Sequence, residues 1–416
     1  MNKPKITISA MGGLRQAYQV ALACQEEGLL NRFFTTFYYK ENSFPYLILE
    51  HLDRLGFSKM KALIENRSLD GLNDRYIKNY LGIEMLTKAL ALCKKENLTR
   101  YSLINPFYDK LISKSLTACD IFYGYEDEAL YSLKKAKELG AITIVERRSL
   151  QPLYHEIVKE ELQRLGLPVP GHLRSKRLDF VMERKFTEMK TADYLLVYTN
   201  RFKSYLMEKH EIPKGKIIVL PLGGDLQLFY PRKDNKKKKV GNRFRILFVG
   251  QIGLRKGVHY LLEAVRQLNI DIELQLIGRI SAGMKPILSQ YSGHFNYIGP
   301  VPHHMLAYYY NNADVFVLPS LIDNFALVIY EAMASGLPII ITENCGAEIR
   351  DGVDGFRIPI RDVQALKDKM LLLYEDKGLR EQMGINARQW AEQHSWEKYR
   401  ERIASTLLHI YQKGRG

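Results

Sequence analysis

Few cysteines and no long apolar run characterise this chain of 416 residues. Its four cysteines, Cys24, Cys93, Cys119 and Cys345, are far apart and lack the spacing of a metal site. No segment approaches the roughly 18 consecutive apolar residues of a membrane-spanning helix. The opening residues lack the apolar core of a signal peptide. We therefore expect a cytoplasmic protein with reduced cysteines and no membrane-spanning helix.

Basic residues outnumber acidic ones, and the formal net charge is +15. This balance favours anionic partners such as nucleotide phosphates, nucleic acid or acidic lipid headgroups. Part of the excess lies in Lys236-Lys-Lys-Lys239, which is typical of a solvated linker. Because the charge is accompanied by no known nucleic-acid module and no basic-aromatic stripe, we expect no nucleic-acid partner. Peripheral contact with the anionic inner face of a membrane is a further expectation.

Short apolar segments alternate with helix-like segments in both halves of the chain, which indicates parallel sheets covered by helices on both faces. Residues 45–118 are mainly helical in pattern. The expected strands of the first half are 5–10, 32–37, 120–123, 141–145, 194–198 and 216–220. Those of the second half are 245–249, 272–277, 295–298, 314–318, 338–342 and 355–358.

The chain is longer than one hydrophobic core usually supports, so two domains are expected. We predict a Rossmann-like domain over 1–225 on the acceptor side, a basic linker over 226–242 and a second Rossmann-like domain over 243–392. A helix over 393–416 is expected to cross back to the first domain. The sequence contains no short internal repeat, so a solenoid is not expected. The expected fold is therefore α/β, with two doubly wound domains that face a central cleft.

One acidic residue stands alone in an apolar segment. Glu331 is the only charge in the run Phe325–Gly336, which is expected to form a buried helix. A buried carboxylate without strong donors is costly or gives up its charge. We predict that hydroxyls of a bound nucleotide sugar satisfy Glu331. An internal salt bridge to arginine or lysine is the alternative.

Asp323 is expected in the loop between the strand 314–318 and that helix. The amides of Asn324, Phe325, Ala326 and Leu327 would then form a helix start with unpaired N–H groups. Such groups can bind phosphate or sugar oxygens. A plain N-cap is the alternative role of Asp323.

A second loop combines glycines with two cations. The segment Phe248–Gly257 follows a strand, contains Gly253, Arg255 and Lys256, and precedes a predicted helix over 258–268. Glycines let backbone approach a ligand closely, and the two cations complement a diphosphate. The residue order is neither that of a P-loop nor that of the dinucleotide fingerprint. Solvated surface cations are the alternative for this segment by itself.

These segments resemble the retaining, nucleotide-sugar-dependent glycosyltransferases of family 4, which have the GT-B fold. The resemblance covers about residues 190–400 and is thin before them. It rests on Phe248–Gly257 and Pro319–Pro338, with further matches at Gly12-Gly13, Pro221–Asp225, Asn344–Glu348 and Gly352–Phe356.

The resemblance implies a catalytic group made of Arg255, Lys256 and Asp323. The two cations would hold the donor diphosphate, and Asp323 would contact the transferred sugar. The amides of Phe325–Leu327 would face the donor phosphate or sugar. The loop residue Gly253 would belong to the same donor site.

The resemblance also implies positions for the rest of the donor. Glu331 would bind ribose hydroxyls, and Val301 would lie beside the base. Gly12 and Gly13 would let the first domain close on the donor.

Four departures from the family pattern bear on activity. The family usually has Glu at Asp323, and its Gly-Phe-Gly segment is Asn324-Phe325-Ala326 here. Gln251 stands where an arginine is common, so Arg255 is expected to supply that charge. The histidine often found in the first domain has no clear counterpart.

Three charged residues, Glu146, Arg147 and Arg148, follow the predicted strand 141–145. The carboxyl end of a strand in a doubly wound sheet is where ligands bind. We therefore predict contact with an acceptor hydroxyl or phosphate. An ion-paired loop is the alternative.

The expected function is that of a retaining hexosyltransferase. It would move a hexose from a nucleoside diphosphate sugar, UDP- or GDP-linked, to a hydroxyl of a glycan or lipid-linked acceptor, as in polysaccharide or glycolipid synthesis. No cofactor and no essential metal are expected, because Arg255 and Lys256 would replace the metal. A catalytically weak GT-B protein that binds nucleotide or glycan is the alternative from another class, and an epimerase of the same fold is the nearest enzymatic one.

Overall fold

A computed structural model describes residues 3–38, 67–92, 100–150, 153–169, 176–231 and 243–415 of the chain. Cys93, the run Lys236–Lys239 and much of the helical region expected over 45–118 lie outside the described residues. The chain divides into two compact units. Unit 1 comprises Met1–Arg148, Pro170–Leu220 and Tyr399–Gly416, and unit 2 comprises Ser149–Val169 and Pro221–Lys398.

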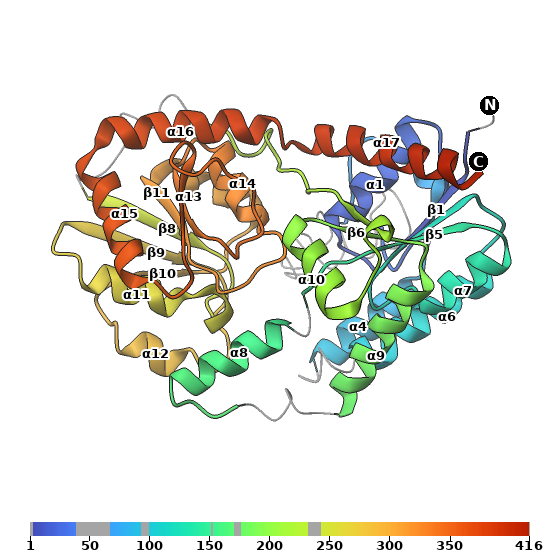
Figure 1. Cartoon of the computed structure of the whole chain (residues 1–416), viewed down its shortest axis with the longest axis horizontal. Coiled ribbons are helices and arrows are strands. Elements are labelled where there is room, and N and C mark those ends of the chain that lie inside the picture. The colour runs from blue at the N-terminus through green and yellow to red at the C-terminus, as the bar shows by residue number, and fades with distance from the viewer. Residues whose placement is uncertain are drawn as a thin grey trace, which may run out of the picture. The chain divides into compact units, whose positions relative to one another are not determined.

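Unit 1 contains a parallel sheet whose described strands follow the order β3-β2-β1-β4-β5-β6-β7 (Figure 1). Its winding therefore reverses between β1 and β4. The strands are β1 (Ile6–Ala10), β2 (Leu30–Thr35), β3 (Ile77–Asn79), β4 (Ile121–Tyr125), β5 (Ile142–Glu146), β6 (Tyr194–Val197) and β7 (Ile217–Val219).

The helices of unit 1 connect these strands and cover the sheet. In α1, the residues from Ala17 to Cys24 are buried. The helices are α1 (Arg15–Glu26), α4 (Leu81–Leu92), α6 (Asn105–Ser115), α7 (Leu130–Glu138), α9 (Lys176–Thr191) and α10 (Asn200–His210), with a π-helical turn η2 (Arg100–Ile104) before α6.

Unit 2 contains a second parallel sheet, with the described order β10-β9-β8-β11-β12-β13. This is the 3-2-1-4-5-6 order of doubly wound nucleotide-binding domains, and its winding reverses between β8 and β11. The strands are β8 (Phe244–Val249), β9 (Ile272–Ile277), β10 (Asn296–Gly299), β11 (Val315–Leu318), β12 (Ile339–Thr342) and β13 (Gly355–Ile358).

Helices flank the sheet of unit 2, where α11 packs against α15 and α14 packs against α16 (Figure 1). They are α8 (Leu153–Arg164), α11 (Val258–Arg266), α12 (Lys285–Ser289), α13 (Leu306–Asn312), α14 (Leu327–Ala334), α15 (Val363–Glu375) and α16 (Lys377–Glu392). Short 3₁₀ turns η6 (Leu254–Lys256) and η7 (His303–Met305) precede α11 and α13. The last helix, α17 (Trp396–Arg415), begins in unit 2 and continues in unit 1.

The core of unit 2 forms around its central strands. Ile246, Leu247, Phe316 and Val317 have no exposed surface. Burying each such side chain stabilises a fold by about 1.5–3 kcal/mol. The β8 and β11 backbones are thereby fixed side by side, and the loops that leave them start from rigid positions.

The parallel doubly wound sheets confirm the predicted α/β class. Strands predicted over 272–277 and 355–358 have the bounds found for β9 and β13. Strand β3 was not predicted, and the helix expected near Phe325 begins at Leu327. Within the described ranges, no helix combines the length and apolar character that crossing a membrane requires.

Candidate functional site

The loops after β8 and β11 meet at the carboxyl edge of the unit 2 sheet. The backbone N–H of Leu321, after β11, donates to the carbonyl of Arg255, after β8, at 2.9 Å. Ligands of doubly wound sheets bind where the strand order reverses. The two sequence segments singled out for a diphosphate and a sugar are therefore brought together at the expected edge.

Arg255 and Lys256 both pair with Asp323. Arg255 Nη1 lies 2.9 Å from Asp323 Oδ1 and donates to the Ile322 carbonyl at 3.1 Å. The Lys256 ammonium donates to Asp323 Oδ2. Burial alone would raise the pKa of Asp323, but Lys256 and Arg255 outweigh it and hold that pKa below its usual value. Asp323 is therefore ionised at neutral pH, and two cations share its one negative charge.

The cations keep partial access to solvent. The side chain of Arg255 is 25% exposed and that of Lys256 is 10% exposed. A small anion can therefore reach the Arg255 guanidinium without unfolding the loop.

Glycine is required where the two loops touch. Gly257 has a φ of +65°, and a Cβ there would lie 1.9 Å from the Pro319 carbonyl oxygen. At Gly253, a Cβ would lie 2.5 Å from Ser281 Oγ. A side chain at position 257 would push the β8 loop away from β11, so Gly257 keeps Arg255 and Lys256 close to Asp323. The contact at Gly253 is with the loop that follows β9.

The start of α14 lies beside this cluster. Ala326 is its N-cap and is buried, and Asp323 is not the N-cap. The helix therefore begins at Leu327, two residues after the predicted start near Phe325. Phe325 stacks on Tyr330 with ring centroids 5.2 Å apart. The first amides of α14 have no acceptor within their own helix, so they are available in principle to oxygen ligands.

Glu331, in the second turn of α14, has neutral or titratable partners. Its Oε1 lies 2.8 Å from His303 Nε2, and its Oε2 accepts a hydrogen bond of 3.0 Å from the Tyr310 hydroxyl. Burial, and then the Glu331 charge, raise the pKa of Tyr310, so this hydroxyl stays protonated and donates. Among described residues, no arginine or lysine contacts Glu331.

His303 and Tyr310 were not predicted as part of the site. The signal that could have found them is the need of a buried carboxylate for donors. Val301 lies between β10 and η7, two residues before His303, and packs against the core of unit 2. The residue predicted to flank a base is therefore on the segment that also carries a partner of Glu331.

Gly12 and Gly13 follow β1 in unit 1 and lie against an arginine. Gly12 donates to Thr36 Oγ1 at 3.0 Å, and a Cβ on it would lie 2.0 Å from Arg67 Nη1. Gly13 has a φ of +83°. Arg67 in turn pairs with Glu84 at 2.8 Å. The positive φ favours glycine at position 13, whereas a side chain at position 12 would displace the end of the Arg67 side chain.

Glu146, Arg147 and Arg148 lie in a buried polar network. Glu146 is the last residue of β5, where the sequence had placed it just after the strand, and it has no exposed surface. It accepts hydrogen bonds from the Tyr123 and Tyr198 hydroxyls. Burial raises the pKa of Glu146 more strongly than these hydrogen bonds lower it.

The two arginines of this network contact one glutamate. Arg147 Nη1 lies 3.0 Å from Glu126 Oε2, and the Arg148 backbone N–H donates to Glu126 Oε1 at 3.0 Å. Arg147 is 2% exposed. The ion-paired alternative thus describes the contacts found here, and the predicted contact with an acceptor stays a prediction.

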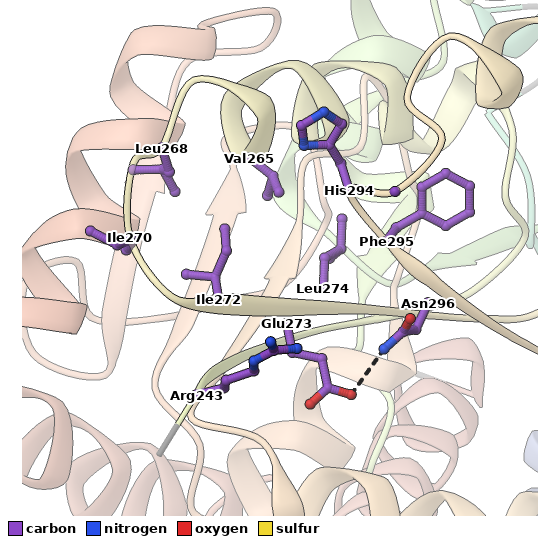
Figure 2. A pocket seen from close by; sticks show the side chains of 11 residues that line it. Arg243, Val265, Leu268, Ile270, Ile272, Glu273, Leu274, His294, Phe295 and Asn296 are labelled. Atoms are coloured by element: carbon purple, nitrogen blue, oxygen red, sulfur yellow. Dashed lines mark hydrogen bonds between the residues drawn. The ribbon is translucent and has the colours of Figure 1, made fainter. Parts of the chain in front are cut away.

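A small pocket lies at the other edge of the unit 2 sheet. It has a volume of about 230 Å³ and is lined at the amino ends of the strands by residues such as Arg243, Ile272 and Phe295 (Figure 2). Glu273 accepts a hydrogen bond from Asn296 at 3.1 Å on its rim. None of the predicted site residues lines this pocket.

Metal-ligating side chains do not gather in the described part of the chain. Over those residues, no group of three or more His, Cys, Asp and Glu is arranged to hold a metal ion. Cys24, Cys119 and Cys345 are buried and free.

Comparisons with known proteins concern the family and the fold. Residues 230–390 match the sequence profile of the family described as glycosyl transferases group 1. The chain is 30% identical over 218 residues to a D-inositol 3-phosphate glycosyltransferase of Paenarthrobacter aurescens. That match covers 46% of this chain and 53% of the relative. The chain thus spans about half the length of the curated relatives it matches.

Solved structures share the fold at low sequence identity. Sucrose-phosphate synthase from Thermosynechococcus elongatus has a TM-score of 0.62 and 18% identity, over 99% of both chains. Anabaena HepE in complex with UDP has a TM-score of 0.64 and 14% identity, over 97% of this chain and 99% of its own. These similarities confirm the predicted GT-B fold.

Proposed function

We propose that the chain, whose residues 230–390 match the profile of the group 1 glycosyl transferases, belongs to that family and is a retaining hexosyltransferase. The donor is a nucleoside diphosphate sugar, and UDP is the first candidate because a structure of the same fold is a UDP complex. The acceptor is a hydroxyl of a glycan or of a lipid-linked saccharide.

One observation carries this proposal. Arg255, Lys256 and Asp323 converge where the strand order reverses, and Glu331 lies in the adjacent helix α14. A diphosphate at the two cations would place its nucleoside toward Glu331 and its sugar toward Asp323. Preorganised cations stabilise the negative charge that develops on a leaving diphosphate.

Asp323 fits a role toward the sugar because it is ionised. Its pKa is held low by Lys256 and Arg255, so it keeps its charge at neutral pH. A carboxylate near the anomeric carbon stabilises the positive charge of an oxocarbenium-like transition state. It also orients both cations until the donor arrives.

The proposed reaction exchanges one C–O bond for another on the same face of the sugar. The bond between the anomeric carbon and the diphosphate breaks, and the acceptor oxygen bonds to that carbon. The acceptor proton passes to the leaving phosphate. The cations Arg255 and Lys256 hold the product nucleoside diphosphate, so no metal or cofactor is required in this proposal.

The remaining donor contacts follow from α14 and η7. Glu331 accepts hydrogen bonds from ribose hydroxyls, for which it exchanges or shares its contacts with His303 and Tyr310. Val301 flanks the base. The start of α14, at Ala326–Leu327 after Asn324 and Phe325, supplies N–H groups to the phosphate or sugar.

Residues of unit 1 are proposed for the acceptor. These are Glu146, Arg147 and Arg148, at the carboxyl end of β5. Gly12 and Gly13, which follow β1, are proposed instead to let the first domain close on the donor. The net charge of +15 suits an anionic glycan or a lipid-linked acceptor at the inner face of a membrane. The predicted domains, with a linker over 226–242 and a crossing helix over 393–416, are part of the same proposal.

The catalytically weak alternative rests on Asp323, Asn324 and Ala326, which depart from the family pattern, and on the missing histidine of the first domain. Ala326 has a φ of −92°, which any residue adopts, so alanine does not strain the start of α14. Backbone strain at this position is therefore no argument for the binding protein, and the assay below decides between the two.

A transfer assay tests the proposal. The purified protein is incubated with UDP-, GDP- and ADP-linked hexoses, and release of nucleoside diphosphate is measured together with the anomeric configuration of the product. Release with retention supports the proposal. Binding of a donor without any turnover supports the binding protein, and an altered free sugar nucleotide supports an epimerase.

A further inference from the structure

Helix α8 comes between β5 and β6 of the unit 1 sheet, yet it belongs to unit 2. It packs against η6, the turn that carries Arg255 and Lys256. A segment that only connected β5 to β6 would not need to pack against η6 of unit 2. The helix must therefore be held in unit 2 by specific contacts.

Glu161 is the main anchor of α8. Its carboxylate has no exposed surface, and it lies 3.0 Å from His259 Nε2 and 3.0 Å from Arg361 Nε. The Tyr260 hydroxyl donates to it at 2.5 Å. Burial would raise the pKa of Glu161, but hydrogen bonds from His259, Tyr260 and Arg361 lower it to about 2. The carboxylate is thus ionised and fully satisfied in place.

Tyr154 makes the second contact of α8. The guanidinium of Arg255 lies over its ring, 5.1 Å from the ring centroid. An arginine in this position is attracted to the ring face, and its side chain loses rotational freedom. The other end of the same guanidinium donates to Asp323 and Ile322. Arg255 is therefore fixed from two sides.

The two contacts lie on one face of α8. Tyr154 and Glu161 are seven residues apart, or about two helical turns, so their side chains point in nearly the same direction. Their partners are also close in sequence, because Arg255 is in η6 and His259 and Tyr260 are in the first turn of α11. One helix face therefore holds the whole segment from Arg255 to Tyr260.

We propose that α8 positions the diphosphate-binding turn, with Tyr154 and Glu161 as positioning residues for Arg255. This inference rests on the proposed function, in which Arg255 contacts the donor diphosphate. In this proposal, the ring of Tyr154 orients the guanidinium of Arg255. Glu161 holds α8 close enough to η6 for that ring to contact the guanidinium. Neither residue touches the reacting atoms.

The first test compares Tyr154→Phe with Tyr154→Leu. The affinities of UDP, GDP and ADP are measured by calorimetry, and those of the matching nucleosides without phosphate by ligand-observed NMR. Phenylalanine keeps the ring, so wild-type affinity is expected. Leucine removes it, and the affinity for the diphosphate should fall about 3- to 10-fold while that for the nucleoside is unchanged.

The second test compares Glu161→Gln with Glu156→Gln. Both glutamates are on α8, but Glu156 is exposed. Glu161→Gln should lower diphosphate affinity like Tyr154→Leu, whereas Glu156→Gln should leave it unchanged. Melting temperatures are measured in parallel, and activity assays should show a higher donor KM with a smaller change in kcat.

The outcomes separate the two proposals. If the wild type binds none of the three diphosphates, the proposed function fails, and this inference fails with it. If the wild type binds one, but Tyr154→Leu and Glu161→Gln bind it equally well, only the positioning role is overturned. Equal losses for diphosphate and nucleoside, or failure of Tyr154→Phe to keep affinity, would also overturn it by indicating a general structural effect.

Discussion

Each unit buries a carboxylate at the carboxyl edge of its sheet, but the two carboxylates have opposite surroundings. Glu146 of unit 1 lies among tyrosine hydroxyls and has a raised pKa, because burial dominates. Asp323 of unit 2 lies between Lys256 and Arg255 and has a lowered pKa. In sequence, both are acids next to an apolar strand.

The partners explain the difference. Burial raises the pKa of Glu146 more than the tyrosine hydrogen bonds and the nearby Arg148 charge lower it. The two cations at Asp323 carry more charge than one carboxylate balances, and Arg255 is 25% exposed. The cluster in unit 2 therefore has excess positive charge at a partly exposed arginine, whereas burial dominates the surroundings of Glu146 in unit 1.

The largest effect is expected when one cation is removed from each unit and the donor kinetics of the two variants are compared. Lys256→Ala should lower kcat/KM for the donor by about tenfold or more, because a charge-assisted contact to the diphosphate is lost. Lys185 of unit 1, buried and 3.1 Å from Asp127, is the matched control. Lys185→Ala should reduce the melting temperature and leave the donor KM unchanged. Unchanged kinetics in Lys256→Ala would remove the diphosphate assignment.

A smaller effect is expected at Glu331. Glu331→Gln keeps the shape of the side chain but halves its capacity to accept hydrogen bonds from ribose hydroxyls. Nucleotide affinity should fall by about 5- to 20-fold, as for a hydrogen bond to a charged group. Circular dichroism should show a folded domain. Unfolding, or unchanged affinity, would show that Glu331 is structural.

The comparison predicts opposite pH dependences for two amide variants. The folded-state pKa of Asp323 is lowered, so the stability of the wild type relative to Asp323→Asn should be fully present above about pH 4 and decline as the pH falls. The folded-state pKa of Glu146 is raised, so the stability relative to Glu146→Gln should be present below about pH 4.5 and decline as the pH rises. Denaturant titrations across pH 3–8 measure both. Parallel slopes would contradict the comparison.

No effect on turnover is expected when metal ions are removed. Because cations of unit 2 replace a metal in the proposed reaction, excess EDTA should leave turnover unchanged. Loss of activity that Mg²⁺ or Mn²⁺ restores would show that the two cations are not sufficient.

Much of the fold could be predicted because its strands are apolar runs bounded by polar loops. Strand β9, Ile272–Ile277, was predicted with its observed bounds for this reason. Strand β3 was missed because two of its three residues, Lys78 and Asn79, are exposed and polar. The start of α14 lies at Leu327, two residues after the predicted start near Phe325, a difference that local composition does not resolve.

The residues of the candidate site could be singled out from the sequence, but the contacts between them could not. Two cations in a glycine-containing loop pointed to Arg255 and Lys256. The isolated acid in the loop after a strand pointed to Asp323, and the lone charge in an apolar helix pointed to Glu331. Their partners could not be predicted, because Asp323 is 67 residues from Lys256 and Glu331 is 28 residues from His303. The contact of Tyr154 with Arg255 depends on α8 belonging to unit 2, for which the sequence carries no local signal.

Thermal denaturation of the wild type and of Lys256→Ala with UDP-, GDP- and ADP-sugars tests the donor site most directly. A ligand that binds the native state raises its melting temperature. At least one sugar nucleotide should raise that of the wild type by several degrees and that of Lys256→Ala by much less. Equal shifts in both proteins, or no shift in the wild type with any of the three, would contradict the assignment of this site.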